Sequence, residues 1–191
     1  MKNLFLSLVV VASFSMISCK KENKSNISET LLYSKRGENP GIYDQLGRYV
    51  ILRGVNYNVL GDYWQANSNI ATQKQYDEND LKLMSKYGIN CIRLVFSWSK
   101  LEPVRTQYNQ QYIQEIKQII EAAAKYNIYV LIDMHQDAWG KYIATPTNVI
   151  CDKPNNGWDG APEWATITDG ASTCTRDGSR ESAPAVVHAF Q

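Results

Sequence analysis

The chain has 191 residues, of which 44% are hydrophobic and 20% are charged, an ordinary composition for a globular protein. Lys and Arg number 20 and Asp and Glu 19, which leaves a formal net charge of +1 at pH 7. Nucleic-acid binding requires a basic patch that neutralises phosphates, and no basic patch stands out in this sequence. We therefore expect no nucleic-acid partner.

Residues 1–18 predict a signal peptide. The start, Met1-Lys2-Asn3, is short and cationic, and residues 4–17 form an apolar stretch. That stretch has the length of a signal peptide and is shorter than the roughly 20 residues that a membrane-spanning helix needs. The sequence therefore predicts an exported protein.

Cys19 follows the small residue Ser18 where this apolar stretch ends. The arrangement resembles the cleavage box of bacterial lipoproteins, and the resemblance implies that Cys19 becomes a lipidated N-terminus anchored in a membrane. Met16 and Ile17 differ from the commonest box, so secretion without an anchor is the alternative. The polar stretch over residues 19–40 is then expected to be a flexible tether.

From about residue 41 the chain alternates strand and helix patterns. The predicted strands are 49–56, 90–96 and 129–134, and the predicted helices start at Asp77 or Asn79, at Asn109 and near Ala185. This order favours a parallel sheet with right-handed crossovers. Residues 129–134 are hydrophobic without alternation, which is typical of a strand buried on both faces.

Polar and titratable side chains follow where the predicted strands end. Asn56 ends the first strand, and His135 and Asp137 follow the third. A single histidine is more often a buried residue satisfied by its neighbours, but the recurrence at several strand ends favours an active site. Two ligands spaced i and i+2 do not make a metal site, so we expect a hydrogen-bonding role and no metal.

The second predicted strand carries a charge inside an apolar run. Arg93 stands between Ile92 and Leu94, where an unpaired charge is costly, so a carboxylate partner is expected. A purely structural ion pair is the alternative. Trp98 follows the same strand and offers an aromatic face on which a sugar could stack, with plain packing as the alternative.

The cysteines beyond Cys19 fall into two groups. Cys91 lies in an apolar strand and is expected to be a free buried thiol. Cys151 and Cys174 lie in the long polar loop between about residues 139 and 183. Because an exported protein can form disulfides, pairing between these two is expected.

Several of these segments resemble a known family. The segments LRGVN (52–56), GINCIRL (88–94) and WSKLEP (98–103) resemble the opening of glycoside hydrolase family 5, the clan A retaining glycosidases. The segments DMHQD (133–137) and GAPEWAT (160–166) are similar to the endoglycoceramidase-related group. The resemblance covers about residues 41–191 and implies an α/β fold, the N-terminal part of a (β/α)8 TIM barrel with about three β/α units.

The resemblance implies an enzyme that hydrolyses O-glycosyl bonds, here between an oligosaccharide and ceramide. An endo-β-glucanase or mannanase of the same family is the alternative. Arg93 matches the family arginine that hydrogen-bonds the nucleophilic carboxylate, and His135 matches the histidine that binds a sugar hydroxyl, assisted by Asp137. Trp98 and Asn56 complete the expected substrate-binding set. The expected partners are a glycan or glycosphingolipid and the membrane, and no cofactor is implied.

Both catalytic carboxyl groups are expected outside this chain. Retaining glycosidases need two of them, about 5 to 5.5 Å apart. By the resemblance both lie on later strands, the first in an Asn-Glu-Pro motif, and this sequence contains no such motif. A complete barrel also takes roughly 250 residues. The sequence is therefore expected to be the N-terminal piece of a longer glycosidase, inactive alone. The alternative from another class is a non-catalytic fragment or sugar-binding remnant.

Overall fold

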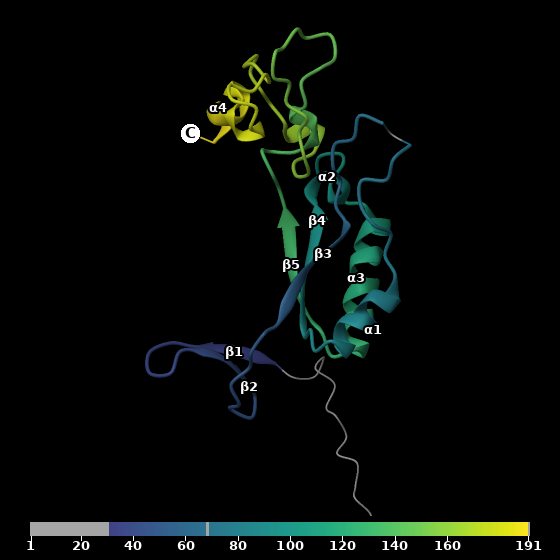
Figure 1. The fold of residues 1–191 in the computed structure, drawn as a ribbon, viewed down its shortest axis with the longest axis vertical. Helices are drawn as coiled ribbons and strands as arrows, with labels where there is room; N and C mark the ends of the chain where they lie inside the picture. The colour runs from purple at the N-terminus through teal and green to yellow at the C-terminus, as the bar shows by residue number, and fades with distance from the viewer. Residues whose placement is uncertain (1–30, 68, 191) are drawn as a thin grey trace, which may run out of the picture.

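A computed structural model describes residues 31–67 and 69–190 (Figure 1). Its elements are β1 (Leu32–Lys35), β2 (Gly41–Asp44), β3 (Gly54–Leu60), α1 (Glu78–Lys86), β4 (Cys91–Ser97), α2 (Trp98–Leu101), α3 (Gln110–Lys125), β5 (Tyr129–His135) and α4 (Pro184–Ala189), with 3-10 turns at Lys141–Ile143, Glu163–Ala165 and Arg180–Ser182. The predicted signal peptide and Cys19 lie outside the described residues. In the described ranges, no helix is both long and apolar enough to span a bilayer.

The central sheet is parallel, as the sequence predicted, and its three strands lie in the order β3-β4-β5. Helices α1 and α3 lie along one face of this sheet, and the opposite face carries no helix in Figure 1. This arrangement is three strands of a (β/α) barrel with the crossover helices on the outside. Polar side chains at the carboxyl ends of the strands therefore meet beyond one end of the sheet.

Both crossover helices begin at the caps that the sequence predicted. Asp77 accepts a hydrogen bond from the backbone N–H of Asn79 at the start of α1, at 2.9 Å. Asn109 accepts one from the N–H of Tyr112 at the start of α3, at 3.1 Å. Each bond satisfies a backbone donor that has no partner inside the helix.

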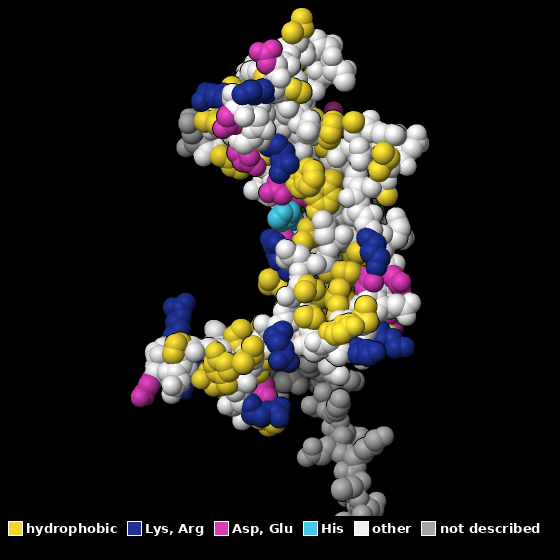
Figure 2. Space-filling model, viewed as in Figure 1, with side chains coloured by type: hydrophobic (Ala, Val, Ile, Leu, Met, Phe, Trp, Pro, Cys, Tyr) yellow, Lys and Arg dark blue, Asp and Glu magenta, His cyan; other side chains and the backbone are white. Residues whose placement is uncertain are grey.

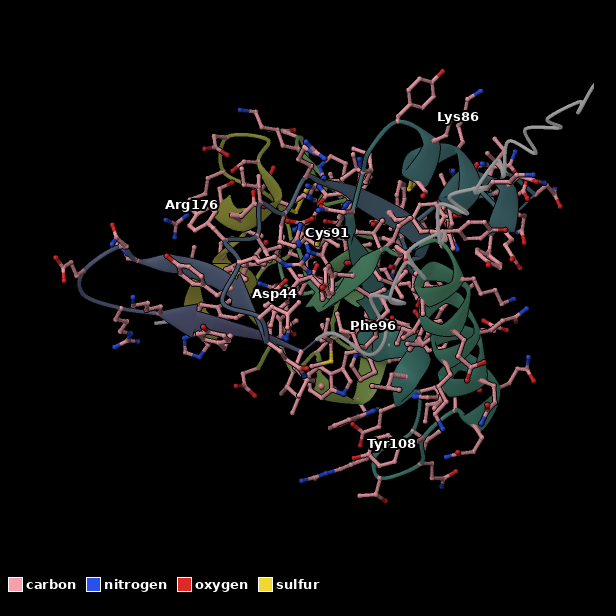
Figure 3. All side chains as sticks on the ribbon, turned by 90° about the horizontal axis from the view of Figure 1, so that it is seen from below. Asp44, Lys86, Cys91, Phe96, Tyr108 and Arg176 are labelled. Atoms are coloured by element: carbon pink, nitrogen blue, oxygen red, sulfur yellow. A yellow bond between two sulfur atoms is a disulfide. The ribbon has the colours of Figure 1, made fainter. Side chains whose placement is uncertain are left out.

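The main hydrophobic core lies between the sheet and these two helices. Alternate residues of β4 point into it, while the residues between them face the opposite side of the sheet. The fully buried members include Leu81, Ile92, Leu94, Ile119 and Ala123. Figure 3, seen from below, shows Phe96 among the side chains between the sheet and the helices.

The first strand of the sheet starts later than predicted. The prediction of residues 49–56 is wrong, because pairing begins only where Gly54 lies opposite Cys91 and continues to Leu60. Tyr49 and Ile51 precede the strand and are 61% and 65% exposed. The apolar residues before Gly54 resemble a strand in the sequence, but they do not pair with β4.

The third strand has the predicted position but not the predicted burial. Leu131 and Ile132 point to opposite faces of β5 and are 58% and 53% exposed. The reason is that β5 is the edge of the described sheet and that the helices cover one face only. Burial on both faces, as the unbroken hydrophobic run suggested, is therefore not found.

The end of the predicted tether is ordered. Strands β1 and β2 form an antiparallel hairpin, so residues 32–35 belong to a strand and the boundary at residue 40 is wrong. Tyr33 and Tyr43 stack across the hairpin with ring centroids 5.9 Å apart, which favours pairing over an extended polar coil. Figure 3 shows the hairpin projecting away from the sheet.

The long segment between β5 and α4 has a small core of its own. Ile143, Ala183, Ala185 and Val186 are buried together, and Trp139 packs against them. Cys151 and Cys174 form a disulfide with Cα atoms 5.9 Å apart, while Cys91 is free. The segment is thus tied to itself and to the carboxyl end of the sheet, where the candidate site lies.

Candidate functional site

Four side chains form a continuous polar row on the sheet face opposite the helices. Arg93 on β4 reaches toward the neighbouring strand, and its Nη2 lies 2.9 Å from Oδ2 of Asp133 on β5. Nδ1 of His135 lies 3.1 Å from the same oxygen, and Nε2 of His135 contacts Oδ2 of Asp137 at 3.1 Å. We name Arg93, Asp133, His135 and Asp137 the polar row.

Both ring nitrogens of His135 have polar partners. Nη2 of Arg93 approaches Nδ1 of His135 at 3.3 Å, and Oδ2 of Asp133 lies 3.1 Å from the same nitrogen. Nε2 faces Oδ2 of Asp137 at 3.1 Å. The imidazole is therefore held from both sides.

The carboxylate predicted for Arg93 is Asp133, which the sequence did not single out. The two residues lie on adjacent strands, and Asp133 stands two positions before His135, so both side chains point to the same sheet face. The side chains of Arg93 and Asp133 are 38% and 22% exposed. Figure 2 shows that this flank of the molecule is hollowed between the β1–β2 hairpin and the C-terminal segment. The polar row is therefore open to a ligand.

A mostly apolar pocket of about 250 Å³ adjoins the row at His135. Its lining consists of aromatic, apolar and small residues together with that histidine: Trp98, Met134, His135, Gln136, Trp139, Gly160, Ala161 and Phe190. His135 thus belongs to both the polar row and the pocket. A ligand that contacts His135 would meet the hydrogen-bonding groups of the polar row on one side and the apolar surface of the pocket on the other.

Trp98 follows β4 directly, as the first residue of α2. Its indole Nε1 donates to Oε2 of Glu102 at 2.8 Å, and its ring packs edge-on against Trp164 at 5.4 Å. These contacts fix the ring while it lines the pocket. Packing and pocket lining are therefore both roles of this tryptophan.

Asn56 does not lie at a strand end. It stands inside β3, opposite Arg93 in the sheet register, and β3 continues to Leu60. The prediction that Asn56 ends the first strand is wrong for this reason, while its substrate-binding role stays a prediction. The residues that follow β3 include Asp62, which reaches the site region instead.

A second polar cluster, which sequence reasoning missed, lies at the carboxyl end of β4. Ser97 Oγ donates to Asp159 Oδ2 at 2.6 Å and accepts from the N–H of Asp62 at 2.9 Å. Ser99 Oγ donates to Asp62 Oδ2 at 2.7 Å, and Lys141 Nζ contacts the same oxygen at 2.9 Å. These residues are far apart in sequence, so no local pattern identified them.

The pKa values of Asp159, of Lys141 and of the nearby Tyr63 are raised in the second cluster. Burial raises the pKa of Asp159. Burial, and next the charge of Asp159, raise the pKa of Tyr63. Burial alone would lower the pKa of Lys141, but its hydrogen bond to Asp62 and the charge of that carboxylate raise it. The lysine therefore stays charged beside Asp62.

The backbone beyond β5 adopts an unusual conformation beside the pocket. Ala138 and Trp139 have φ values of 46° and 82°, a region that residues with a side chain rarely occupy. Such strain persists only where surrounding contacts impose it, and it occurs often at functional sites. Here it turns the chain from Asp137 toward the pocket. In the described part of the chain, no group of three or more His, Cys, Asp or Glu side chains is arranged to hold a metal.

Known proteins share this arrangement of elements. Residues 44–169 match the family model of Cellulase (glycosyl hydrolase family 5). An endoglycoceramidase from Hydra vulgaris is 32% identical over 130 residues, which are 68% of this chain and 23% of that protein. The chain thus spans about a quarter of the length of this relative.

Solved structures agree with the sequence relatives. A crystal structure of an endogalactoceramidase superimposes with a TM-score of 0.76 at 42% identity, over 81% of this chain and 35% of that one. Endo-glycoceramidase II from Rhodococcus sp., in a complex with ganglioside GM3, gives a TM-score of 0.58 at 30% identity, over 78% of this chain and 33% of that one. With its parallel sheet, its crossover helices and its matched residues, the chain belongs to glycosyl hydrolase family 5.

Proposed function

We propose that this chain is part of an endo-acting retaining β-glycosidase that cleaves the bond between an oligosaccharide and ceramide. The main observation in support of the proposal is that His135 belongs to both the polar row and the lining of the apolar pocket. A glycosphingolipid has the matching chemistry, because it joins a polyhydroxylated sugar to an apolar chain. The relatives named as endoglycoceramidases and the ganglioside complex of the Rhodococcus enzyme support this choice.

The polar row supplies sugar recognition in this proposal. Asp137 has carboxylate oxygen available to accept from sugar hydroxyls, and His135 contributes a ring fixed by Arg93 and Asp137. Oδ2 of Asp133 already faces both Arg93 and His135, so we assign Asp133 the role of ordering those two groups. Binding and orientation are therefore the tasks of these four residues.

The bond-breaking carboxyl groups are not assigned to the polar row. A retaining mechanism uses one carboxylic acid as acid and base and a second as nucleophile, about 5 to 5.5 Å apart across the scissile bond. We place both outside the residues described here. Arg93 would then also orient the nucleophilic carboxylate, the role that the family resemblance implies.

A glucanase or mannanase is the second candidate, since the matching family is described as Cellulase. Its substrates carry hydroxyl groups on both sides of the scissile bond, which suits the polar row but not the apolar lining of Trp98, Trp139 and Phe190. A non-catalytic sugar-binding fragment is the candidate from another class. It would use the same row without turnover.

The test compares three substrates on the product of the complete coding sequence: lactosylceramide in detergent micelles, cellohexaose and mannohexaose. We expect kcat/KM for lactosylceramide to exceed both others by at least about tenfold. Replacing Trp139 by Ala is expected to reduce the preference for lactosylceramide, because it opens the apolar pocket. A higher kcat/KM for either hexasaccharide would favour the second candidate, and binding without hydrolysis of any substrate would favour the third.

We also propose that the protein is exported and anchored to a membrane through lipidated Cys19. The apolar residues 4–17 and the cysteine that follows Ser18 support this proposal. A lipid anchor would hold the enzyme at the surface where its lipid substrate is found. Secretion without an anchor is the alternative.

A further inference from the structure

Trp98, the residue that α2 supplies to the apolar pocket, is held by the side chain of Glu102. The indole Nε1 of Trp98 donates to Oε2 of Glu102 at 2.8 Å, and the backbone N–H of Glu102 donates to the carbonyl oxygen of Trp98 at 2.8 Å. The two residues lie four positions apart, so one turn of helix brings their side chains together. Glu102 therefore fixes the indole directly, through its own carboxylate.

The carboxylate of Glu102 has a donor on each oxygen. Oε2 accepts from the indole of Trp98, and Oε1 accepts from the backbone N–H of Thr106 at 2.7 Å. These two hydrogen bonds, the one from Trp98 first, lower the pKa of Glu102. The group therefore stays ionised, although only 9% of the residue is exposed. A neutral amide at this position would have one oxygen for the two donors.

A second tryptophan packs behind the first and has a different acceptor. The ring of Trp164 lies edge-on against that of Trp98, with centroids 5.4 Å apart. Its Nε1 donates to the backbone carbonyl oxygen of Glu102 at 2.9 Å. Glu102 thus contacts Trp98 through its carboxylate and Trp164 through its main chain. Only the contact to Trp98 is lost when the side chain of Glu102 is replaced.

The orientation of the Trp98 ring affects the shape of the pocket. The torsion between Cβ and an aromatic ring is broad and roughly two-fold, so packing alone selects a ring orientation weakly. The hydrogen bond to Glu102 selects one orientation, because the indole carries its N–H on one edge only. Trp98 and His135 line the same cavity of about 250 Å³. A rotated indole would therefore change the apolar surface that a ligand meets beside His135.

We propose that Glu102 is a positioning residue that fixes the Trp98 indole as a wall of the apolar pocket, and so sets the affinity for the lipid part of a glycosphingolipid. The inference deepens the proposed function and rests on it for the identity of the lipid. The effect on the ring itself does not depend on any substrate. The competing explanation is that Glu102 serves only the turn at Thr106, through the bond to its N–H.

The first test follows the Trp98 ring by ¹⁹F spectra of the product of the complete coding sequence, labelled with 5-fluorotryptophan. Trp98→Phe and Trp164→Phe assign the two resonances. Glu102→Met has a side chain of similar length without oxygen, and we expect it to split or broaden the Trp98 resonance. Trp164 is expected to keep a single resonance, because its acceptor is a backbone carbonyl. Glu163→Gln, at an exposed glutamate beside Trp164, is the control and should leave both resonances unchanged.

Two results of this test would overturn the proposal. One is a folded Glu102→Met variant with the wild-type Trp98 resonance, since the ring would then need no carboxylate. The other is an equal splitting of the Trp98 and Trp164 resonances, since the whole turn would then have moved.

Glu102→Gln decides the matter if Glu102→Met fails to fold. Its amide oxygen can accept from Trp98 or from Thr106, and the spectrum shows which of the two donors it takes. We expect KM for lactosylceramide to follow the ring, so that KM rises if the Trp98 resonance splits and stays at the wild-type value if that resonance stays single. A split resonance with the wild-type KM, or a single resonance with a raised KM, would contradict the proposal.

The second test asks whether the effect passes through the indole N–H. Glu102→Met is expected to raise KM for lactosylceramide about fivefold, with a smaller change in kcat. For p-nitrophenyl β-lactoside, which has the same sugar and no alkyl chain, we expect a change below about twofold. In a Trp98→Phe background, which keeps an aromatic ring without the N–H, Glu102→Met should raise KM for lactosylceramide no further. An equal rise in both backgrounds would assign Glu102 to the turn at Thr106 and overturn the proposal.

The two tests separate this proposal from the proposed function. A split Trp98 resonance in a protein that hydrolyses no glycosphingolipid would refute the function and leave the positioning of the ring standing. An unchanged Trp98 resonance in a Glu102→Met variant that hydrolyses lactosylceramide normally would refute the positioning role alone.

Discussion

Arg93 on β4 and Asp133 on β5 form an ion pair across adjacent parallel strands, with Nη2 and Oδ2 2.9 Å apart, on the sheet face that no described helix covers. Both residues stand inside strands and not in loops. The pair therefore has the rigid support of the sheet, and both of its members contact Nδ1 of His135.

Replacing Arg93 by Lys should damage activity more than stability. Lysine keeps the charge, but its side chain is one bond shorter and lacks the planar guanidinium, so one ammonium cannot reproduce the contacts to Asp133 and His135. We expect kcat/KM to fall at least about tenfold, while the free energy of unfolding changes by about 1 kcal/mol or less for this partly exposed pair. Arg53→Lys, in an exposed arginine outside the row, is the control. Equal effects of the two substitutions on kcat/KM would contradict the role of Arg93.

The disulfide between Cys151 and Cys174 should stabilise the long loop. It closes a loop with a sequence separation of 23 residues, for which the chain-entropy model gives about 3 kcal/mol. The double variant Cys151→Ala/Cys174→Ala is expected to lose about that much unfolding free energy in urea titrations. Mass spectrometry of the unreduced protein after alkylation under denaturing conditions should label Cys91 and leave these two unlabelled. Alkylation of all three without reductant would disprove the pairing.

The burial of Asp159 predicts a pH dependence of stability. Its folded-state pKa is raised above the usual aspartate value of about 3.9, so the folded state holds the proton more tightly than the unfolded state. The stabilisation of the folded state by this tighter proton binding is fully present below about pH 3.9, and it is lost as the pH rises through the folded-state pKa of Asp159. Asp159→Asn lacks the titration, so its stability relative to wild type should rise from pH 4 to pH 7. Urea unfolding at both pH values measures the difference. Asp152→Asn, at an exposed aspartate, is the control. A stability difference between Asp159→Asn and the wild type that does not change with pH would be inconsistent with a raised pKa of Asp159.

Much of the fold follows from local patterns in the sequence. Asp77 and Asn109 begin helices because their side chains accept hydrogen bonds from N–H groups that the helix leaves free. The start of β3 could not be predicted in this way, because Tyr49 and Ile51 are apolar yet precede the strand pairing at Gly54. Strand limits depend on a partner that is distant in the sequence.

The site was predictable where residues lie close together in the chain. His135 ends β5, Asp137 follows it, and the two side chains contact each other. Asp159 was missed because it contacts Ser97 and Asp137, which are 62 and 22 positions away in the sequence. Asp133 could have been found from the two-residue period of a strand, which puts it on the same face as His135.

The proposed lipid anchor predicts where the protein is found in the cell. Cys19→Ala removes the only sulfur that lipidation at this position could use, so the variant should leave the membrane fraction for the soluble fraction when cells are broken without detergent. Ser18→Ala keeps a small residue before the cysteine and is the matched control. A Cys19→Ala variant that sediments with membranes as fully as the wild type would rule out the anchor.

The central claim is that His135 binds the sugar of a glycosphingolipid, and its most direct measurement is kcat/KM for the release of the intact oligosaccharide from ganglioside GM3. In the product of the complete coding sequence, His135→Ala is expected to lower this value more than tenfold, at least about 1.4 kcal/mol of transition-state stabilisation, with little change in Tm. His188→Ala, in the exposed histidine of α4, should leave it within about twofold. Wild-type kcat/KM in a folded His135→Ala variant would contradict the account.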